Sequence, residues 1–326
     1  MDEIKVCVIG AGRLSSKRIY PYLGTGGGQL VGVCDKDLSK AETNAVRYGS
    51  RPYSKVDEML EIEKPDAVIV CIGPEQHYEM AIKLMKLGFP VYTEKPSAPD
   101  AAMALEMARI SQETGVLCTT AFKKRYNVAY NRAKKWLASF DSSKHYAISV
   151  DYASAPYSND SPRSFFLLDF AIHMIDLTPY LFGDISEVFS FSKGPNAYAV
   201  SVKFVSGAIG SLSFNCGRTY ELPTEEVEIT LEGGNFMSIH NSSCWKIAED
   251  GKAVEWREPP TFISSGDSGN ETGHLAEIAD FLEAVRCKRS TRSNIYESYK
   301  SMVFYEAIKR SAENGEVVKV IYEESK

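Results

Sequence analysis

A helical pattern in the second half of the chain gathers side chains that could do acid–base chemistry on an alcohol. Asp169, His173 and Asp176 are four and three residues apart, so an α-helix would carry them on one face. The residues between them are apolar, which predicts a largely buried helix whose ionisable groups need partners or a cavity. Imidazole titrates near neutral pH, so His173 is the candidate general base for a secondary alcohol. We expect Asp169 to orient the imidazole or bind a neighbouring hydroxyl, and Asp176 to make a hydrogen bond in the core.

A second pattern, Tyr92-Thr93-Glu94-Lys95-Pro96, stands where a buried strand is predicted to end. In a doubly wound fold, the carboxyl ends of the strands border the ligand crevice. There the ammonium group of Lys95 would donate a hydrogen bond to a substrate hydroxyl and ease its deprotonation. The alternative is a surface pair of Lys95 with Glu94, which would contribute little stability. The peptide bond before Pro96 is also of the kind in which a cis conformation occurs.

The elements that must position these groups begin with a strand–turn–helix pattern near the N-terminus. A short apolar run, Val6–Ile9, leads into Gly10-Ala11-Gly12 and then into a helical pattern. Gly10 permits a sharp turn, Gly12 lets a pyrophosphate approach the backbone, and the free N–H groups of a helix N-terminus attract phosphate. Asp35 ends the next strand about 20 residues later, where a carboxylate accepts hydrogen bonds from an adenosine ribose. The alternative is an ordinary turn of another doubly wound protein, because Ser15 takes the third glycine position.

This dinucleotide pattern also predicts which cofactor binds. Asp35 favours the free 2′-hydroxyl of NAD and repels a 2′-phosphate, whereas Lys36 would soften that repulsion, so we predict NAD with NADP as the alternative. The loop after the apolar run 67–72 is expected at the same edge, where Pro74 would pack on a ribose. For His77, a helix-start histidine without a functional role is the alternative. The predicted cofactor contacts are Gly10, Ala11, Gly12, Arg13, Leu14, Asp35, Lys36, Gly73, Pro74, His77, Glu94 and Lys95.

The length and composition predict two globular domains. The chain has 326 residues, 44% of them apolar and 25% charged, with a net charge of −6. No basic stretch is long enough to follow a phosphate backbone, so no nucleic-acid partner is predicted. We interpret Lys123-Lys124-Arg125 either as a solvated face or as a contact to a substrate anion or hydroxyl. The predicted substrate contacts are Lys95, Arg125, Tyr152, Asp169 and His173.

The sequence carries no sign of secretion, a membrane span or a structural metal. The acidic start, Met1-Asp2-Glu3, is unlike a secretory signal, and no apolar run approaches the roughly 18 residues that cross a bilayer. The seven cysteines are scattered and odd in number, which is typical of small core residues in a reducing compartment. They form no Cys-x-x-Cys pair and no close set with histidine. We therefore predict a cytoplasmic protein without metal or membrane association.

Strand and helix patterns alternate over the first 121 residues, which predicts an α/β fold with a doubly wound parallel sheet. Apolar runs without alternation, such as 67–72, suit parallel strands that are buried on both faces. This region, 1–121, is the predicted Rossmann domain. The expected strands are 4–9, 30–34, 67–72, 90–93 and 116–120, and the expected helices are 13–23, 38–48, 55–62, 76–87 and 99–114.

Runs with a period of two dominate residues 122–326, which predicts an α+β domain with a large, open, mostly antiparallel sheet. The segments 153–164 and 264–270 are rich in small polar residues and are predicted loops. A C-terminal helix is expected to pack back on the first domain. The expected strands are 146–152, 186–193, 198–205, 208–215, 225–232, 235–240 and 317–321, and the expected helices are 127–139, 168–182, 273–288 and 295–313.

Three ordered elements make the chain resemble the Gfo/Idh/MocA oxidoreductases, a family that includes inositol dehydrogenases and glucose–fructose oxidoreductase. The matching elements are Gly10-Ala11-Gly12, Glu94-Lys95-Pro96 and Asp169-x-x-x-His173-x-x-Asp176. The resemblance implies a Rossmann domain followed by a substrate-binding and oligomerisation domain, whose open sheet often mediates homodimers or homotetramers. It also implies that the family's catalytic lysine, aspartate and histidine correspond to Lys95, Asp169 and His173.

For function, the resemblance implies hydride transfer between NAD or NADP and a secondary alcohol or ketone of a sugar or cyclitol. A rival is a redox-neutral enzyme with tightly bound NAD, which would oxidise a sugar transiently so that a substituent can be eliminated. A non-catalytic NAD-binding protein is disfavoured, because the three matching catalytic residues are retained. Many members carry a glycine-rich stretch before the Asp/His helix, where this chain has Phe165 and Phe166. That bulk is expected to reshape the substrate pocket.

Overall fold

The structure is a computed structural model of the chain, and it describes residues 3–156, 166–258, 269 and 271–324. The chain forms two compact units. The first comprises residues 1–123, 273–300 and 324–326, and the second comprises residues 124–272 and 301–323. The predicted domains, 1–121 and 122–326, differ from these units chiefly in the segment 273–300. That segment has an amphipathic helical pattern, which does not reveal the core it joins.

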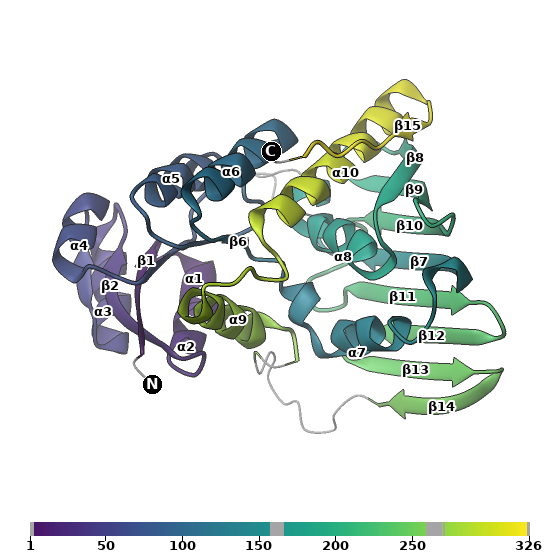
Figure 1. Cartoon of the computed structure of the whole chain (residues 1–326), viewed down its shortest axis with the longest axis horizontal. Coiled ribbons are helices and arrows are strands. Elements are labelled where there is room, and N and C mark those ends of the chain that lie inside the picture. Colours follow the sequence, from purple (N-terminus) through teal and green to yellow (C-terminus); the bar gives the residue numbers. More distant parts are fainter. Residues whose placement is uncertain (1–2, 157–165, 259–268, 270, 325–326) are drawn as a thin grey trace. The chain divides into compact units, whose positions relative to one another are not determined.

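The first unit contains a six-stranded sheet with the order β3-β2-β1-β4-β5-β6, in which all neighbouring strands are parallel (Figure 1). Every residue of β4 is buried, as expected for a parallel strand that is covered on both faces. The predicted Rossmann architecture is confirmed. The strands are β1 (Ile4–Ile9), β2 (Gly28–Cys34), β3 (Arg51–Tyr53), β4 (Ala67–Val70), β5 (Val91–Thr93) and β6 (Cys118–Thr120).

The helices of the first unit include one from late in the sequence, α9. Its side chains Ile278, Phe281 and Leu282 are buried in the same core as Val6 and Leu30 of the sheet. This apolar face explains why the segment 273–300 joins the first unit. The helices are α1 (Arg13–Arg18), α2 (Tyr20–Leu23), α3 (Leu38–Tyr48), α4 (Val56–Glu63), α5 (Pro74–Lys86), α6 (Ala101–Thr114) and α9 (His274–Cys287).

Two local predictions in this unit are wrong. The helix expected over 13–23 is broken at Ile19, and Pro21 lies in the first turn of α2. Proline has no backbone N–H, so it cannot continue the hydrogen-bond ladder of α1. Strand β3 is missing from the prediction because Arg51-Pro52-Tyr53 is short and contains proline, which sheets accept at an edge.

The second unit contains a nine-stranded sheet with the order β14-β13-β12-β11-β7-β10-β9-β8-β15. Only the pair β7–β10 is parallel, so the predicted mostly antiparallel sheet is confirmed. The hairpin β13–β14 is missing from the prediction, although Asp250-Gly251 between alternating residues is a typical hairpin signal. The strands are β7 (His145–Ala153), β8 (Ile185–Ser192), β9 (Ala197–Phe204), β10 (Ile209–Asn215), β11 (Thr224–Leu231), β12 (Asn235–His240), β13 (Cys244–Glu249), β14 (Lys252–Arg257) and β15 (Val318–Lys319).

Helices of the second unit cover one face of this sheet (Figure 1). They are α7 (Val128–Leu137), α8 (Ile172–Phe182) and the later part of α10 (Ile295–Asn314). The hydroxyl of Ser190 in β8 donates a hydrogen bond to the carbonyl of Ile308 in α10 at 2.6 Å. The other face exposes Phe191, Ile209 and Trp256. The sheet therefore has one face in the core and one open face.

Candidate active site

The turn after β1 has the conformation that its glycines predict. Gly10 has a φ angle of +104°, and a Cβ atom there would lie 2.1 Å from the carbonyl oxygen of Cys71. Only glycine fits at this position. Gly12 precedes α1, and apart from its own chain neighbours nothing lies within 4 Å of where its Cβ atom would be. This open space permits a pyrophosphate to approach the backbone. The next two side chains, Arg13 and Leu14, are exposed.

Asp35 follows β2 and is tied directly to this turn. Its Oδ2 atom accepts a hydrogen bond from the N–H of Ala11 at 2.7 Å, and its Oδ1 atom accepts one from the N–H of Asp37 at 2.9 Å. Each carboxylate oxygen has a further lone pair, which leaves capacity to accept from a ribose hydroxyl. Lys36, beside it in the chain, is exposed. The glycine turn and the predicted ribose-binding carboxylate thus lie together.

The turn after β5 leaves one side chain half-buried. Every residue from Val91 to Ala98 is buried except Lys95. Glu94 is 8% exposed, and its carboxylate accepts a hydrogen bond from the N–H of Lys95 at 3.1 Å. Burial raises the pKa of the Glu94 carboxyl, although the positive charges of Lys95 and Lys123 oppose the shift. Because β1, β4 and β5 are parallel neighbours, this turn lies at the same edge of the sheet as the glycine turn.

The loop between β4 and α5 lies at that edge too. Gly73 precedes α5 as its N-cap residue, and Pro74 occupies the first helical position, where its missing N–H costs nothing. His77, one turn further, is only 1% exposed. Its Nε2 atom accepts a hydrogen bond from the N–H of Ile72 at 3.0 Å, and its Nδ1 atom lies 2.9 Å from the carbonyl oxygen of Pro96. The imidazole therefore connects this loop with the turn that contains Lys95.

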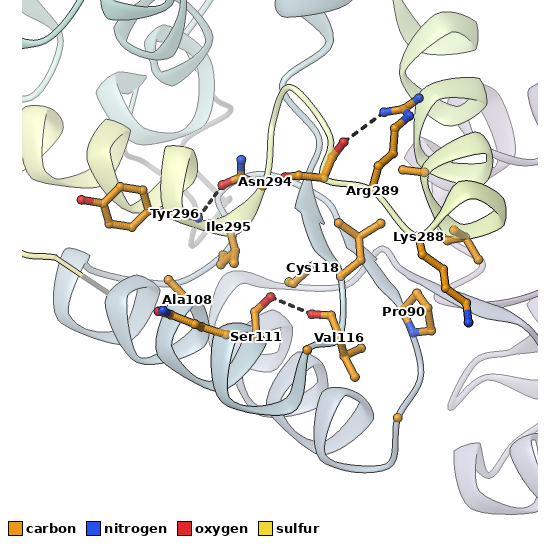
Figure 2. Close-up of a pocket in the computed structure, with 17 residues that line it drawn as sticks. Pro90, Ala108, Ser111, Val116, Cys118, Lys288, Arg289, Asn294, Ile295 and Tyr296 are labelled. Carbon is orange, nitrogen blue, oxygen red and sulfur yellow. Dashed lines mark hydrogen bonds between the residues drawn. The ribbon is translucent and has the colours of Figure 1, made fainter. Parts of the chain in front are cut away.

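A cavity of about 700 Å³ lies at the opposite edge of the same sheet, where β5 and β6 begin (Figure 2). Pro90 and Val116, which precede these strands, line it together with Lys288 and Arg289, which follow α9. Arg289 forms an ion pair with Asp280 at 2.6 Å. No predicted cofactor or substrate residue lines this cavity. It is separate from the edge that carries the glycine turn.

In the second unit, the predicted helix 168–182 begins with a wider turn. A π-helix spans Leu167–Ala171 and continues directly into α8. His173 and Asp176 both lie in α8 and share a face, as the spacing predicts. Asp169 lies in the π-helical turn that precedes α8, and its position on that face stays a prediction. Asp169 is 9% exposed and His173 is half-buried.

Arg125 and Asp176 form a buried ion pair in the second unit. Their side chains are 2% and 0% exposed, and the Arg125 Nη2 atom lies 2.8 Å from the Asp176 Oδ1 atom. The Arg125 Nε atom donates to the same carboxylate, and the hydroxyl of Ser301 donates to Oδ1 at 2.8 Å. The ring of Tyr180 lies 4.9 Å from the guanidinium group. Asp176 thus has the core hydrogen-bonding role that the sequence indicates, whereas a substrate contact through Arg125 stays a prediction.

A second buried ion pair joins Lys124 to Glu225. The hydroxyl of Tyr130 donates to the Glu225 carboxylate at 2.6 Å, and Lys124 donates to the hydroxyl of Ser242 at 2.9 Å. Burial would raise the pKa of Glu225, but the ammonium group of Lys124 and the hydrogen bonds outweigh it and hold this pKa below its usual value. The solvated-face interpretation of residues 123–125 is therefore wrong for Lys124 and Arg125, which are both buried. No local sequence signal indicates partners so distant in the chain.

A row of aromatic side chains extends from the predicted substrate contact Tyr152. Its ring stacks on Phe166 with centroids 6.2 Å apart, and Phe166 stacks on Phe170 at 5.9 Å. Phe170 in turn contacts Tyr220 at 6.0 Å. Phe166 is buried, so its bulk fills space beside the π-helical turn that carries Asp169. Phe165 and most of the predicted loops 153–164 and 264–270 lie outside the described residues.

Neither a metal site nor a membrane-spanning helix occurs in the ranges that the structure describes. No group of three or more His, Cys, Asp or Glu side chains is arranged to hold a metal ion. None of the helices combines the length and the apolar composition that crossing a bilayer requires.

Comparison with known families places the chain in one of them. The NAD-binding Rossmann-fold model of the Gfo/Idh/MocA oxidoreductase family matches residues 4–122, and the model of the family's C-terminal alpha/beta domain matches residues 157–320. The chain belongs to the Gfo/Idh/MocA oxidoreductase family, as its motifs indicate. It is an NAD(P)-dependent dehydrogenase or reductase with an NAD-binding Rossmann domain. The required Gly10, the open space beside Gly12 and the carboxylate of Asp35 fit such a dinucleotide.

Relatives with assigned activities align with most of the chain. One is a 4-carboxy-2-hydroxymuconate-6-semialdehyde dehydrogenase from Sphingobium sp., 26% identical over 90% of this chain and 93% of the relative. Another is a scyllo-inositol 2-dehydrogenase (NAD(+)) from Bacillus subtilis, 28% identical over 87% of this chain and 86% of the relative. Among solved structures, an oxidoreductase from Agrobacterium radiobacter in complex with NAD+, L-tartaric acid and magnesium has a TM-score of 0.86 at 15% identity. It covers 98% of this chain and 99% of its own, which shows a shared fold.

Proposed function

We propose that this protein transfers a hydride between NAD and a secondary alcohol or ketone of a sugar or cyclitol. The observation that carries the proposal is the half-buried Lys95, the one such side chain in a buried turn at the same sheet edge as the glycine turn. A lysine held there can act on a substrate oxygen next to a cofactor bound at that edge. The inositol dehydrogenase relative supports a polyhydroxylated substrate.

The cofactor would be held by the glycine turn, where Gly12 admits the pyrophosphate and Asp35 accepts a hydrogen bond from the ribose. We assign Ala11, Arg13, Leu14 and Lys36 to the same contact region. When bound, NAD supplies the hydride acceptor for oxidation and, as NADH, the hydride donor for reduction. Gly73, Pro74 and Glu94 would border the nicotinamide half.

Three side chains would act on the substrate alcohol. His173 takes the hydroxyl proton on its imidazole as the carbinol carbon gives up its hydride, so that an alcohol becomes a ketone and one proton is stored on the protein. The Nζ atom of Lys95 donates a hydrogen bond to the same oxygen and stabilises the negative charge that develops there. Asp169 accepts a hydrogen bond from a neighbouring hydroxyl. Reduction follows the same steps in reverse, with His173 returning the proton.

The substrate class is tested by a panel of polyols. The purified protein would be incubated at alkaline pH with NAD+ and with myo-inositol, scyllo-inositol, D-glucose or methyl β-D-glucoside, and NADH would be followed by its absorbance. We expect at least one member to give sustained NADH formation. Cofactor that survives dialysis, without net NADH formation on any member, would instead favour the redox-neutral alternative in which a sugar is oxidised only transiently.

The assignment of His173 is tested by replacing it. His173→Ala should abolish turnover of the panel substrate while NADH still binds, because the imidazole accepts the proton and does not hold the cofactor. The exposed His240 of the same unit offers a matched control, and His240→Ala should retain wild-type turnover. An unchanged kcat in His173→Ala would remove this histidine from the mechanism.

We also propose that the open face of the nine-stranded sheet joins copies of this chain into a homodimer or homotetramer. Small side chains form a row across its centre, because Ser201 pairs with Ser211 and Ser211 pairs with Ser149 on adjacent strands. A flat row of this kind lets a second sheet approach closely. Light scattering should show that Ser211→Arg yields monomers, whereas Glu61→Arg on the exposed side of α4 leaves the assembly intact.

A further inference from the structure

His77 is a buried histidine that is bonded to the backbone of two separate segments. Its Nε2 atom lies 3.0 Å from the amide nitrogen of Ile72, and its Nδ1 atom lies 2.9 Å from the carbonyl oxygen of Pro96. An amide N–H can only donate and a carbonyl can only accept. The geometry therefore defines the tautomer: the ring is neutral, its Nδ1 atom carries the proton that is donated to Pro96, and its Nε2 lone pair accepts the N–H of Ile72.

The two segments that His77 connects have both just left the sheet. β4 ends at Val70 and β5 ends at Thr93, and the ladder between them extends to the hydrogen bond from the N–H of Glu94 to the carbonyl of Val70 at 2.9 Å. Beyond that bond, the imidazole of His77 connects the two segments by hydrogen bonds. It joins Ile72, two residues past β4, to Pro96, three residues past β5.

The residue between these connections is Lys95. On its N-terminal side, the Glu94 carboxylate accepts its backbone N–H at 3.1 Å. On its C-terminal side, the carbonyl of Pro96 is bonded to His77, and the hydroxyl of Ser97 is bonded to that of Ser298 at 2.8 Å. The main chain is therefore fixed on both sides of Lys95, and all residues from Val91 to Ala98 except Lys95 are buried. The imidazole is the part of this frame that reaches back to the β4 segment.

We propose that His77 is a positioning residue that acts through Lys95: its imidazole holds the carbonyl of Pro96 and so determines where the lysine side chain starts. This role differs from the cofactor contact that the sequence predicts for His77. It rests on the proposed function, since it matters for turnover only if Lys95 acts on the substrate. A displacement of a reacting group by about 1 Å is enough to reduce a rate roughly a hundredfold.

Three substitutions separate the two hydrogen bonds. His77→Phe keeps an aromatic ring but loses both bonds. His77→Asn places an amide nitrogen near the position of Nδ1 and keeps the donor to Pro96. His77→Gln places an amide oxygen near the position of Nε2 and keeps the acceptor for Ile72. Because the bond to Pro96 is the one next to Lys95, we expect kcat to fall in the order wild type, Asn, Gln, Phe, with a loss of about a hundredfold in the last.

Two further readouts show whether the loss comes from positioning. Hydrogen exchange of the peptide over residues 94–98, measured by mass spectrometry on the free protein, should accelerate in His77→Phe and less in His77→Asn. NADH affinity, measured by its fluorescence, should stay near that of wild type in all three. Ser111→Ala is the matched control. It removes a partly buried hydrogen bond to the carbonyl of Val116, which lies in the same unit but at the opposite edge of the sheet. It should change neither kcat nor the exchange of residues 94–98.

The closing experiment uses Lys95→Ala alone and combined with His77→Phe, with the panel substrate that wild type oxidises fastest. If His77 acts through Lys95, the double variant should be no slower than Lys95→Ala. An unchanged kcat in Lys95→Ala would sink the proposed role of the lysine. A low kcat in Lys95→Ala with a normal one in His77→Phe, or with unaltered exchange of residues 94–98, would overturn the inference about His77 alone. If His77→Phe does not fold, equal rates and equal exchange in the Asn and Gln variants and wild type would overturn it.

Discussion

The two units secure their candidate catalytic residues by different kinds of bond. In the first unit, the neutral imidazole of His77 bonds to the N–H of Ile72 in the loop after β4 and to the carbonyl of Pro96 in the turn that contains Lys95. In the second unit, α8 carries His173, and one turn further along it Asp176 forms an ion pair with Arg125. Both connections are buried, so water replaces neither of them. One joins a side chain to the main chain, and the other joins two opposite charges.

This difference determines what each connection costs when it is broken. An amide or carbonyl group that loses its buried partner costs about 1–3 kcal/mol of stability. A buried charge that loses its partner costs about 3–5 kcal/mol, because neither water nor a counter-charge replaces the missing one. The first unit should therefore lose catalytic geometry before it loses stability. The second unit should lose stability first.

The largest effect is expected from Asp176→Ala. It leaves the guanidinium of Arg125 buried without its carboxylate, and we expect a loss of about 3–5 kcal/mol in the free energy of unfolding. All three tryptophans, Trp136, Trp245 and Trp256, belong to the second unit, so tryptophan fluorescence during denaturant titration reports on that unit.

The matched control replaces both charges. Arg125→Met combined with Asp176→Leu removes the ion pair without leaving a buried charge, and such replacements are neutral or stabilising in other proteins. We expect the double variant to recover most of the stability that Asp176→Ala loses. Equal losses in both variants would mean that packing, and not the unpaired charge, explains the effect.

An intermediate effect is expected from acid, with opposite signs in the two units. The pKa of Glu225 is lowered, so the unfolded chain binds its proton more readily and the second unit loses stability as pH falls below the usual value of 4.5. The pKa of Glu94 is raised by burial, so the folded first unit binds the proton more readily and gains stability as pH falls through that raised value. Acidification should therefore change the stability of the two units in opposite directions.

Two amide variants measure these contributions. At neutral pH, Glu225→Gln should destabilise the second unit by about 2 kcal/mol, because the hydrogen bonds from Lys124 and Tyr130 lose their charged acceptor, and this deficit relative to wild type should shrink as the medium is acidified. Glu94→Gln should show the reverse trend: as pH falls, the stability of the wild-type first unit should rise relative to that of the variant. Tryptophan fluorescence follows the second unit, and hydrogen exchange of the β1 peptide follows the first. Parallel pH trends for the two variants would contradict the proposed difference between the units.

The same contrast explains how much the sequence could predict. The parallel sheet was predictable because apolar runs such as Ala67–Val70 need no partner to be recognised. The edge strand Arg51–Tyr53 was not predictable, because its proline and its charged residue are untypical of strands. Only its pairing with β2 stabilises it. The hairpin around Asp250-Gly251 carried a recognisable turn signal, and its strands were predictable in principle.

The candidate site divides in a similar way. The glycine turn and Asp35 follow a local pattern, and the structure places them together. The ion pair of Arg125 with Asp176 joins residues 51 positions apart, and no local pattern encodes such a pairing. The π-helical turn at Asp169 likewise has no signal in the sequence, because the apolar spacing there suits an α-helix equally well. Local patterns indicated the candidate residues, whereas the partners of these residues could be identified only from the fold.

The smallest effect is expected from Asp35→Ala, which tests whether charges in the first unit also act through the backbone. The Asp35 carboxylate bonds to the N–H groups of Ala11 and Asp37, so its loss should cost about 1.5 kcal/mol of stability and leave tryptophan fluorescence unchanged. Removing the negative charge should also raise the ratio of NADP to NAD affinity by about tenfold, or roughly 1.4 kcal/mol. Asp37→Ala is the matched control, because it removes an exposed carboxylate of equal charge two residues away. A shift in cofactor preference of the same size in both variants would show that general electrostatics, rather than the position of Asp35 beside the glycine turn, determines the choice of cofactor.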